Sequence, residues 1–216
     1  MTTFFNVDVE TSALTPWDGY LLTVGIQPVR YTPGLGAAMG EERFYVRIDR
    51  NDELAASGWW DGQGTDTFRW WCDQSAEAQD EAWRDDGLVR HEPETAALML
   101  VEFVNGVEAD PKERIFVANP VAFDKMWVDE LFASTGITNP FHYQSLCLRS
   151  MKFGLREKSP WGGTRDNHEP KVPHHAFHDA HAQAIDLLTM IAERDGTGGQ
   201  VAMVSAGAAA GSAQVS

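Results

Sequence analysis

Apolar and polar positions near the start of the chain follow the patterns of three β-strands. Residues 4–11 form an apolar segment that ends in acids, and residues 20–31 are rich in residues that favour strands. Residues 43–49 alternate polar with apolar side chains. Turns that contain glycine or proline separate the three segments, so we expect an antiparallel meander.

Helical patterns dominate the rest of the chain, with one further strand. Asp66 or Thr67 is placed to cap a short helix, and Ser75 to cap the next one. Pro93 opens an amphipathic helix over residues 94–104. The other expected elements are a strand at 114–119, helices at 123–132 and 175–194, and loops at 59–66 and 154–173.

The order strand, strand, strand, helices, strand, helix predicts an α/β fold in one domain. A chain of 216 residues can bury one sizeable core, whereas two domains would each be small. We expect residues 1–195 to form this domain. Residues 196–216 are dominated by glycine, alanine and serine without a periodic pattern, which predicts a mobile tail outside the fold.

The charge balance is strongly acidic, with 32 Asp and Glu residues against 17 Lys and Arg and a net charge of −15. This balance argues against a protein that binds a polyanion through a broad basic surface. It is still compatible with a nucleic-acid enzyme, because metal ions can supply positive charge at a scissile phosphate.

Neither a membrane protein nor a secreted protein is indicated. No apolar stretch is long enough for a transmembrane helix, and the N-terminus lacks the basic region and apolar run of a signal peptide. We therefore expect a soluble, cytoplasmic protein. Cys72 and Cys147 are far apart and outside any CxxC pattern, so we expect neither a disulfide framework nor a zinc site.

Two acids at the end of the first predicted strand are the first candidates for chemistry. Residues i and i+2 of a strand share one face, so Asp8 and Glu10 would stand side by side. Two anions about 4 Å apart repel by roughly 4 kcal/mol at an effective dielectric constant of about 20, and a bound cation relieves this repulsion. The alternative is an edge strand with two solvated acids.

Two later segments also carry candidate side chains. Asp124 lies at the start of a predicted helix, where a carboxylate is electrostatically favoured, so an ordinary first-turn acid is its alternative interpretation. His174 precedes Asp179 by five residues at the entry to the last predicted helix. A surface cluster of His174, His175 and His178 is the alternative there.

Taken together, these segments resemble the motifs of the DEDDh 3′-5′ exonucleases. Asp8-Val9-Glu10-Thr11 resembles the first motif, and residues 119–124, in which a Phe-Asp pair follows a strand, resemble the second. Residues 174–180 resemble the third motif, H-x-A-x-x-D-A. The five-residue offset from Asp179 selects His174 among the three histidines, because His175 occupies an unrestricted position.

A further segment resembles one subgroup of this family. Residues 67–78 match the pattern T-x-x-W-W-x-x-Q-S-x-E-A of the subgroup that contains the phage exonuclease A type and the RNase AS type of 3′-5′ exoribonuclease. This subgroup often carries an Arg-Asp pair before an Arg-Thr. The present chain departs from that pattern, because residues 146–150 keep only Arg149 and the hydroxyl of Ser150.

The resemblance implies a fold and a metal site. The fold would be RNase H-like, with a mixed five-stranded sheet, three antiparallel strands followed by parallel ones, flanked by helices. Two Mg²⁺ or Mn²⁺ ions would be held by Asp8, Glu10, Asp124 and Asp179, since oxygen ligands suit these ions better than zinc. His174 would accept the proton of the attacking water as general base.

The resemblance also implies contacts with substrate. Thr11 and Leu14 would touch the terminal nucleotide, with Leu14 wedged against its base, and Asn119 of the second motif is a further candidate. Trp70 could stack on a base. A place in the core is the alternative for Leu14, and for at least one of Trp70 and Trp71.

The predicted function is a metal-dependent 3′-5′ exonuclease that releases nucleoside monophosphates from single-stranded nucleic acid, with RNA favoured over DNA. A single-stranded DNA exonuclease is the first alternative. A non-catalytic nucleic-acid-binding module is an alternative of another class. Related enzymes are often dimers, so the resemblance also suggests a homodimer, and a phage-encoded member would act in the host cytoplasm.

Overall fold

The computed structural model describes residues 1–56, 66–84, 87–156 and 168–196. Within them one mixed sheet is formed by strands β1 to β6. The strands are β1 (Thr2–Thr11), β2 (Leu21–Thr32), β3 (Gly36–Met39), β4 (Phe44–Arg47), β5 (Arg114–Ala118) and β6 (Ser145–Cys147). Their order is β3-β2-β1-β5-β6, with β4 also paired to β2.

The sheet has six strands where the sequence predicts five, but it is only five positions wide. Strand β4 pairs with residues 23–26 of β2, and β3 pairs with residues 29–32 of the same strand. Since β1 occupies the other edge of β2 along its whole length, β3 and β4 share one position. The pairs of β2 are antiparallel, whereas β1–β5 and β5–β6 are parallel, as expected from the resemblance.

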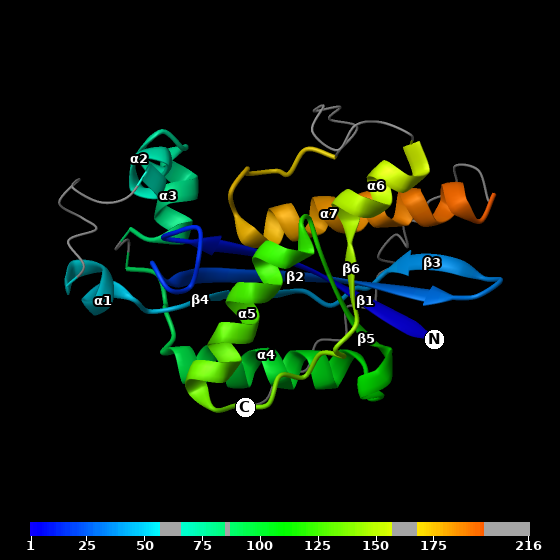
Figure 1. Cartoon of the computed structure of the whole chain (residues 1–216), viewed down its shortest axis with the longest axis horizontal. Coiled ribbons are helices and arrows are strands. Elements are labelled where there is room, and N and C mark those ends of the chain that lie inside the picture. Colours follow the sequence, from blue (N-terminus) through cyan, green and yellow to red (C-terminus); the bar gives the residue numbers. More distant parts are fainter. Residues whose placement is uncertain (57–65, 85–86, 157–167, 197–216) are drawn as a thin grey trace, which may run out of the picture.

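Helices cover both faces of this sheet (Figure 1). They are α1 (Asn51–Ala56), α2 (Asp66–Cys72), α3 (Ala76–Ala82), α4 (Pro93–Val107), α5 (Val121–Thr135), α6 (Leu148–Arg156) and α7 (Ala176–Arg194), with a short 3₁₀ turn at Pro111–Glu113. One core lies between β1 and helices α4 and α5, and a second lies between the sheet and α7. Figure 1 shows α6 and α7 together on the side of the sheet opposite α4.

Two predicted helix starts are confirmed, because Pro93 occupies the first turn of α4 and the side chain of Ser75 accepts a hydrogen bond from the backbone N–H of Ala78. Helix α2 begins at Asp66, so Asp66 and Thr67 lie in its first turn and neither is the residue that caps it. The sequence did not predict α6, which extends to residue 156, into the expected loop. The remainder of the loops at 59–66 and 154–173 lies largely outside the described residues, as does the tail beyond Gly196.

Strand β1 determines which way the candidate acids point. Phe5, Val7 and Val9 are buried in the core with α4 and α5. Because side chains alternate along a strand, Asp8 and Glu10 project from the opposite face, where α7 packs. No described helix is long and apolar enough to cross a membrane.

A glycine allows the start of α7 to approach the sheet closely. Gly25 of β2 is the cross-strand partner of Asp8. A Cβ atom at Gly25 would lie 2.2 Å from the backbone N of Phe177 and 2.3 Å from the carbonyl C of Ala176. The backbone of α7 therefore rests directly on β2, beside the acids of β1.

Candidate active site

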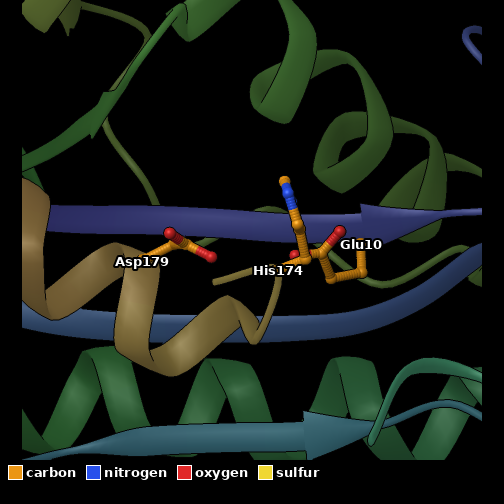
Figure 2. Close-up of side chains that lie close together, drawn as sticks. All are labelled: Glu10, His174 and Asp179. Atoms are coloured by element: carbon orange, nitrogen blue, oxygen red, sulfur yellow. The ribbon is translucent and has the colours of Figure 1, made fainter. Parts of the chain in front are cut away.

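Three side chains from two distant parts of the sequence meet at this contact. One possible ligand atom of each of Glu10, His174 and Asp179 lies within 4.8 Å of the others. Glu10 comes from the end of β1, Asp179 from the first turn of α7, and His174 from the residues just before that helix. Figure 2 shows the Asp179 carboxylate directed toward the side occupied by Glu10 and His174.

The other two predicted acids are tied to the same end of β1. Asp124, in the first turn of α5, accepts a 3.1 Å hydrogen bond at Oδ1 from the backbone N–H of Val9. Asp8 accepts a 2.7 Å hydrogen bond at Oδ1 from Nε2 of Gln183 on α7. All four carboxylates therefore belong to one region, although they come from three separate elements.

Burial and mutual repulsion raise the pKa values of these acids. The pKa values of Asp8 and Glu10 lie well above the usual range, chiefly because of burial and then because of neighbouring carboxylates. Burial raises the pKa of Asp124 to about 7, although backbone N–H groups and the charge of Arg149 oppose it. Burial raises the pKa of Asp179 to about 6, against hydrogen bonds from backbone N–H groups of residues 174 and 175.

This arrangement suits a cation. Four carboxylates cannot all ionise in a buried cluster without positive charge beside them. Their oxygen atoms are the ligands that Mg²⁺ and Mn²⁺ prefer. The donor set therefore fits the divalent ions that the sequence predicts.

His174 is held in a fixed position beside the acids. Its backbone is left-handed, with φ of 62°. Its ring packs edge-on against that of Trp70 on α2, with 4.7 Å between the ring centres. The next residue of α2, Trp71, holds this helix against β1, because its Nε1 donates a 2.9 Å hydrogen bond to the carbonyl oxygen of Thr11. Burial lowers the pKa of His174, so the ring is neutral near pH 7 and able to accept a proton.

The neighbouring histidines make different contacts. The ring of His175 stacks on that of His178 at 4.1 Å and packs against Tyr45 at 4.5 Å. Its Nε2 lies 3.7 Å from a carboxylate oxygen of Glu81 on α3. These contacts direct His175 toward β4 and α3, whereas His174 packs against the tryptophans of α2.

A pocket of about 450 Å³ lies on one side of the acids, and we call it the Leu14 pocket. Its lining includes Glu10 and three of the predicted substrate residues, Thr11, Leu14 and Trp70. Leu14 is 74% exposed and Trp70 is 42% exposed, whereas Trp71 is fully buried. The core alternative is therefore wrong for Leu14 and correct for Trp71. The remaining lining residues are Val9, Ala13, Asp66, Thr67 and Phe123.

A second cavity, of about 370 Å³, also borders this cluster of side chains and is called the Asn119 cavity. His174 and Asp179 line it, together with Asn119. Asn119 is thus separated from the other three predicted substrate residues. The rest of the lining consists of His168, Glu169, Pro170, Pro173, Ala182, Gln183 and Asp186.

Comparison with known families places this site in context. Residues 3–191 match the model of the 3′-5′ exoribonuclease Rv2179c-like domain, and this range contains every residue of the candidate site. The chain belongs to this family.

One curated relative of the Rv2179c-like chain is the 3′-5′ DNA exonuclease Cap18 of Escherichia coli. The two are 32% identical over 113 residues, which cover 49% of this chain and 58% of the relative. The chain therefore matches little more than half of that relative's length. The names of family and relative differ in the nucleic acid they mention.

Solved structures with the same fold include exonuclease I of Escherichia coli. Its complex with a dT13 oligonucleotide matches with a TM-score of 0.55 at 14% identity, over 91% of this chain and 43% of that one. A zinc-bound form with single-stranded DNA matches with a TM-score of 0.54 at 14% identity, over 92% and 42%. At this identity the likeness concerns the fold, and the predicted RNase H-like architecture is confirmed.

Gln183 of this family member contacts a candidate metal ligand although the motifs did not identify it. It is largely buried, and its hydrogen bond fixes the carboxylate of Asp8. A signal was present, because Gln183 lies four residues after Asp179 and so on the same face of the helix. The hydrogen bond itself could not be foreseen without knowing that α7 crosses β1.

The raised pKa values predict how stability depends on pH. A carboxyl group with a raised pKa in the folded state binds its proton more tightly than in the unfolded chain, so the free energy of unfolding falls as pH rises. For Asp124 and Asp179 this loss falls between about pH 4 and about pH 7. In chelator, we expect Tm to be lower at about pH 8 than at about pH 5. The difference should be about 2–4 °C for each kcal/mol by which the free energy of unfolding falls.

Added Mn²⁺ should raise Tm much more at the higher pH, because the ligands must first lose their protons. Thermal unfolding with and without Mn²⁺ at both pH values measures this. An equal Mn²⁺ effect at both pH values would contradict the assignment.

Proposed function

We propose that this protein is a metal-dependent 3′-5′ exonuclease that releases nucleoside monophosphates from single-stranded RNA. The observation that carries the proposal is the meeting of Glu10 and Asp179 with His174, within reach of Asp8 and Asp124. Family membership supports the same reaction.

Asp8, Glu10, Asp124 and Asp179 would hold two Mg²⁺ or Mn²⁺ ions. Bound divalent ions lower the pKa of an attacking water and neutralise charge on a leaving oxygen. Gln183 keeps the Asp8 carboxylate in place, and the backbone N–H of Val9 does the same for Asp124. The neutral ring of His174 accepts the proton of the water at a ring nitrogen.

The two cavities suggest how a strand is placed. Thr11, Leu14 and Trp70 would bind the terminal nucleotide in the Leu14 pocket, where the exposed Leu14 side chain can wedge against a base. Asn119 would contact the next nucleotide from the Asn119 cavity. The scissile phosphate between them would then face the acids.

The choice of RNA is supported by the family's description. The second candidate, a single-stranded DNA exonuclease, is supported by the name of the curated relative and by the DNA oligonucleotides in the exonuclease I complexes. The domain bounds of 1–195, the cytoplasmic location and the homodimer stay predictions.

Parallel digestion of RNA and DNA oligonucleotides of the same sequence, labelled at the 5′ end, tests the proposal. We expect faster shortening of RNA from its 3′ end with Mg²⁺ or Mn²⁺, and none in chelator. Faster cleavage of DNA would favour the second candidate. Binding without cleavage of either substrate in Mn²⁺ would favour the non-catalytic module.

A further inference from the structure

Positive charge is concentrated in one stretch of this acidic chain. Residues 149–171 contain six of the 17 Lys and Arg residues but only three of the 32 Asp and Glu residues. The stretch therefore carries a net charge of +3, and the rest of the chain carries −18. A polyanion would be attracted to this stretch and repelled by most of the remaining surface.

The described part of this stretch begins beside the candidate active site. Strands β5 and β6 are parallel, with Ala118 opposite Cys147, so both end at the same edge of the sheet. Asn119 follows β5 at that edge, and Arg149 stands in the first turn of α6 at the same edge. The charge of Arg149 lowers the pKa of Asp124, in line with a position beside the acidic cluster.

Helix α6 presents a basic and an aromatic side chain on one face. Arg149 and Phe153 are four residues apart, so they are neighbours on the helix surface. Arg149 is exposed, and the Phe153 side chain is 50% exposed. Guanidinium groups bind phosphates, and exposed aromatic rings stack on bases, which is the combination found in single-strand binding surfaces.

Two other cations of the stretch differ in their availability. Lys152 donates to a carboxylate oxygen of the buried Asp186 at 2.8 Å, so its charge is already paired. Lys171 is exposed, and it lies between Pro170 and Pro173, which both line the Asn119 cavity. Within the described ranges, neither Arg149 nor Lys171 forms an ion pair with a carboxylate.

We propose that Arg149, Phe153 and Lys171 bind the single strand on the 5′ side of the scissile bond. This inference rests on the proposed exonuclease function. A strand whose last nucleotide occupies the Leu14 pocket passes the acids, enters the Asn119 cavity and leaves it toward α6. Arg149 and Lys171 contact its phosphates, and Phe153 stacks on one of its bases.

Substrates of two lengths test the proposal. The KM of a single-stranded 12-mer is compared with that of a dinucleotide, which is too short to extend along α6. Stacking contributes about 1–3 kcal/mol per base. Phe153→Ala should therefore reduce the ratio of the dinucleotide KM to the 12-mer KM by about 5- to 150-fold. Arg149→Gln and Lys171→Gln should each reduce the salt dependence of 12-mer binding by about 0.7 in the log–log slope.

Matched controls come from elsewhere on the surface. Leu98→Ala removes an exposed apolar side chain from α4, and Lys112→Gln removes an exposed cation from the turn before β5. In both variants, the dependence of KM on substrate length and the dependence of 12-mer binding on salt should equal those of the wild-type protein. If the three test variants behave like these controls, the proposal is wrong.

Two further readouts separate other outcomes. If Phe153→Ala changes the mass measured by light scattering but not the preference for the 12-mer, the face joins two copies of the chain and the proposal is wrong. If the wild-type protein cleaves neither substrate, the exonuclease proposal fails. Anisotropy of a labelled 12-mer in Ca²⁺ then decides the α6 proposal, because weaker binding by the three variants supports it and unchanged binding overturns it.

Discussion

Asp8→Asn is expected to lower kcat/KM on RNA about a thousandfold while making the metal-free protein more stable. Metal stabilisation of developing charge amounts to several kcal/mol, and a loss of about 4 kcal/mol corresponds to a factor of about 10³. An asparagine Oδ1 can still accept the hydrogen bond from Gln183, so the local structure should persist. Because burial and neighbouring carboxylates raise the pKa of Asp8, a neutral asparagine removes a group that is costly to bury in its ionised form, and Tm in chelator should rise.

The two measurements together make this prediction specific. Loss of activity alone would follow from any damage to the fold, whereas a gain of stability requires that the ionised Asp8 carboxylate is costly to keep in the folded protein. Glu102→Gln, at an exposed position of α4, is the matched control and should change neither quantity. An Asp8→Asn variant that keeps more than about a tenth of the activity would show that the acids do not form the active site.

His174→Ala is expected to lower kcat by about 10²- to 10⁴-fold, the usual contribution of a general base. Mn²⁺ binding measured by calorimetry should persist, because the four carboxylates are unchanged. His175→Ala removes contacts with Tyr45 and His178 but leaves the acids intact, so its effect should be below about tenfold.

A reversed order of the two activities would contradict the choice of His174. Loss of Mn²⁺ binding in His174→Ala would assign the imidazole to the metal instead of to the water, since His174 lies within ligand distance of Glu10 and Asp179. The calorimetric measurement therefore distinguishes a base from a ligand.

Motif spacing predicted which side chains lie on the same face of the sheet, because strand geometry fixes the direction of alternate residues. Carboxylates two residues apart on a strand must share a face, and the structure places Asp8 and Glu10 on the face that α7 covers. The meeting of β1 with the start of α7 could not follow from spacing. It depends on Gly25, whose lack of a side chain becomes meaningful only when β2 and α7 are in contact.

Other differences arise where local sequence carries little information. Strand β3 consists of Gly-Ala-Ala-Met and β6 of only three residues, so neither shows an alternating pattern. Trp70 and Trp71 are equivalent in sequence. Only the packing of α2 on the end of β1, where Trp71 donates to the carbonyl oxygen of Thr11, decides which ring is buried.

The two parts of the candidate site are synthesised at different times, because they come from opposite ends of the chain. Synthesis proceeds from the N-terminus, so Asp8 and Glu10 leave the ribosome long before His174 and Asp179 are added. At about 5–20 residues per second, the delay is roughly 10–30 seconds. A nascent chain that has not yet docked α7 on Gly25 has two acids without their partners. The candidate site is therefore complete only after residues 174–179 have been synthesised and α7 has docked on β2.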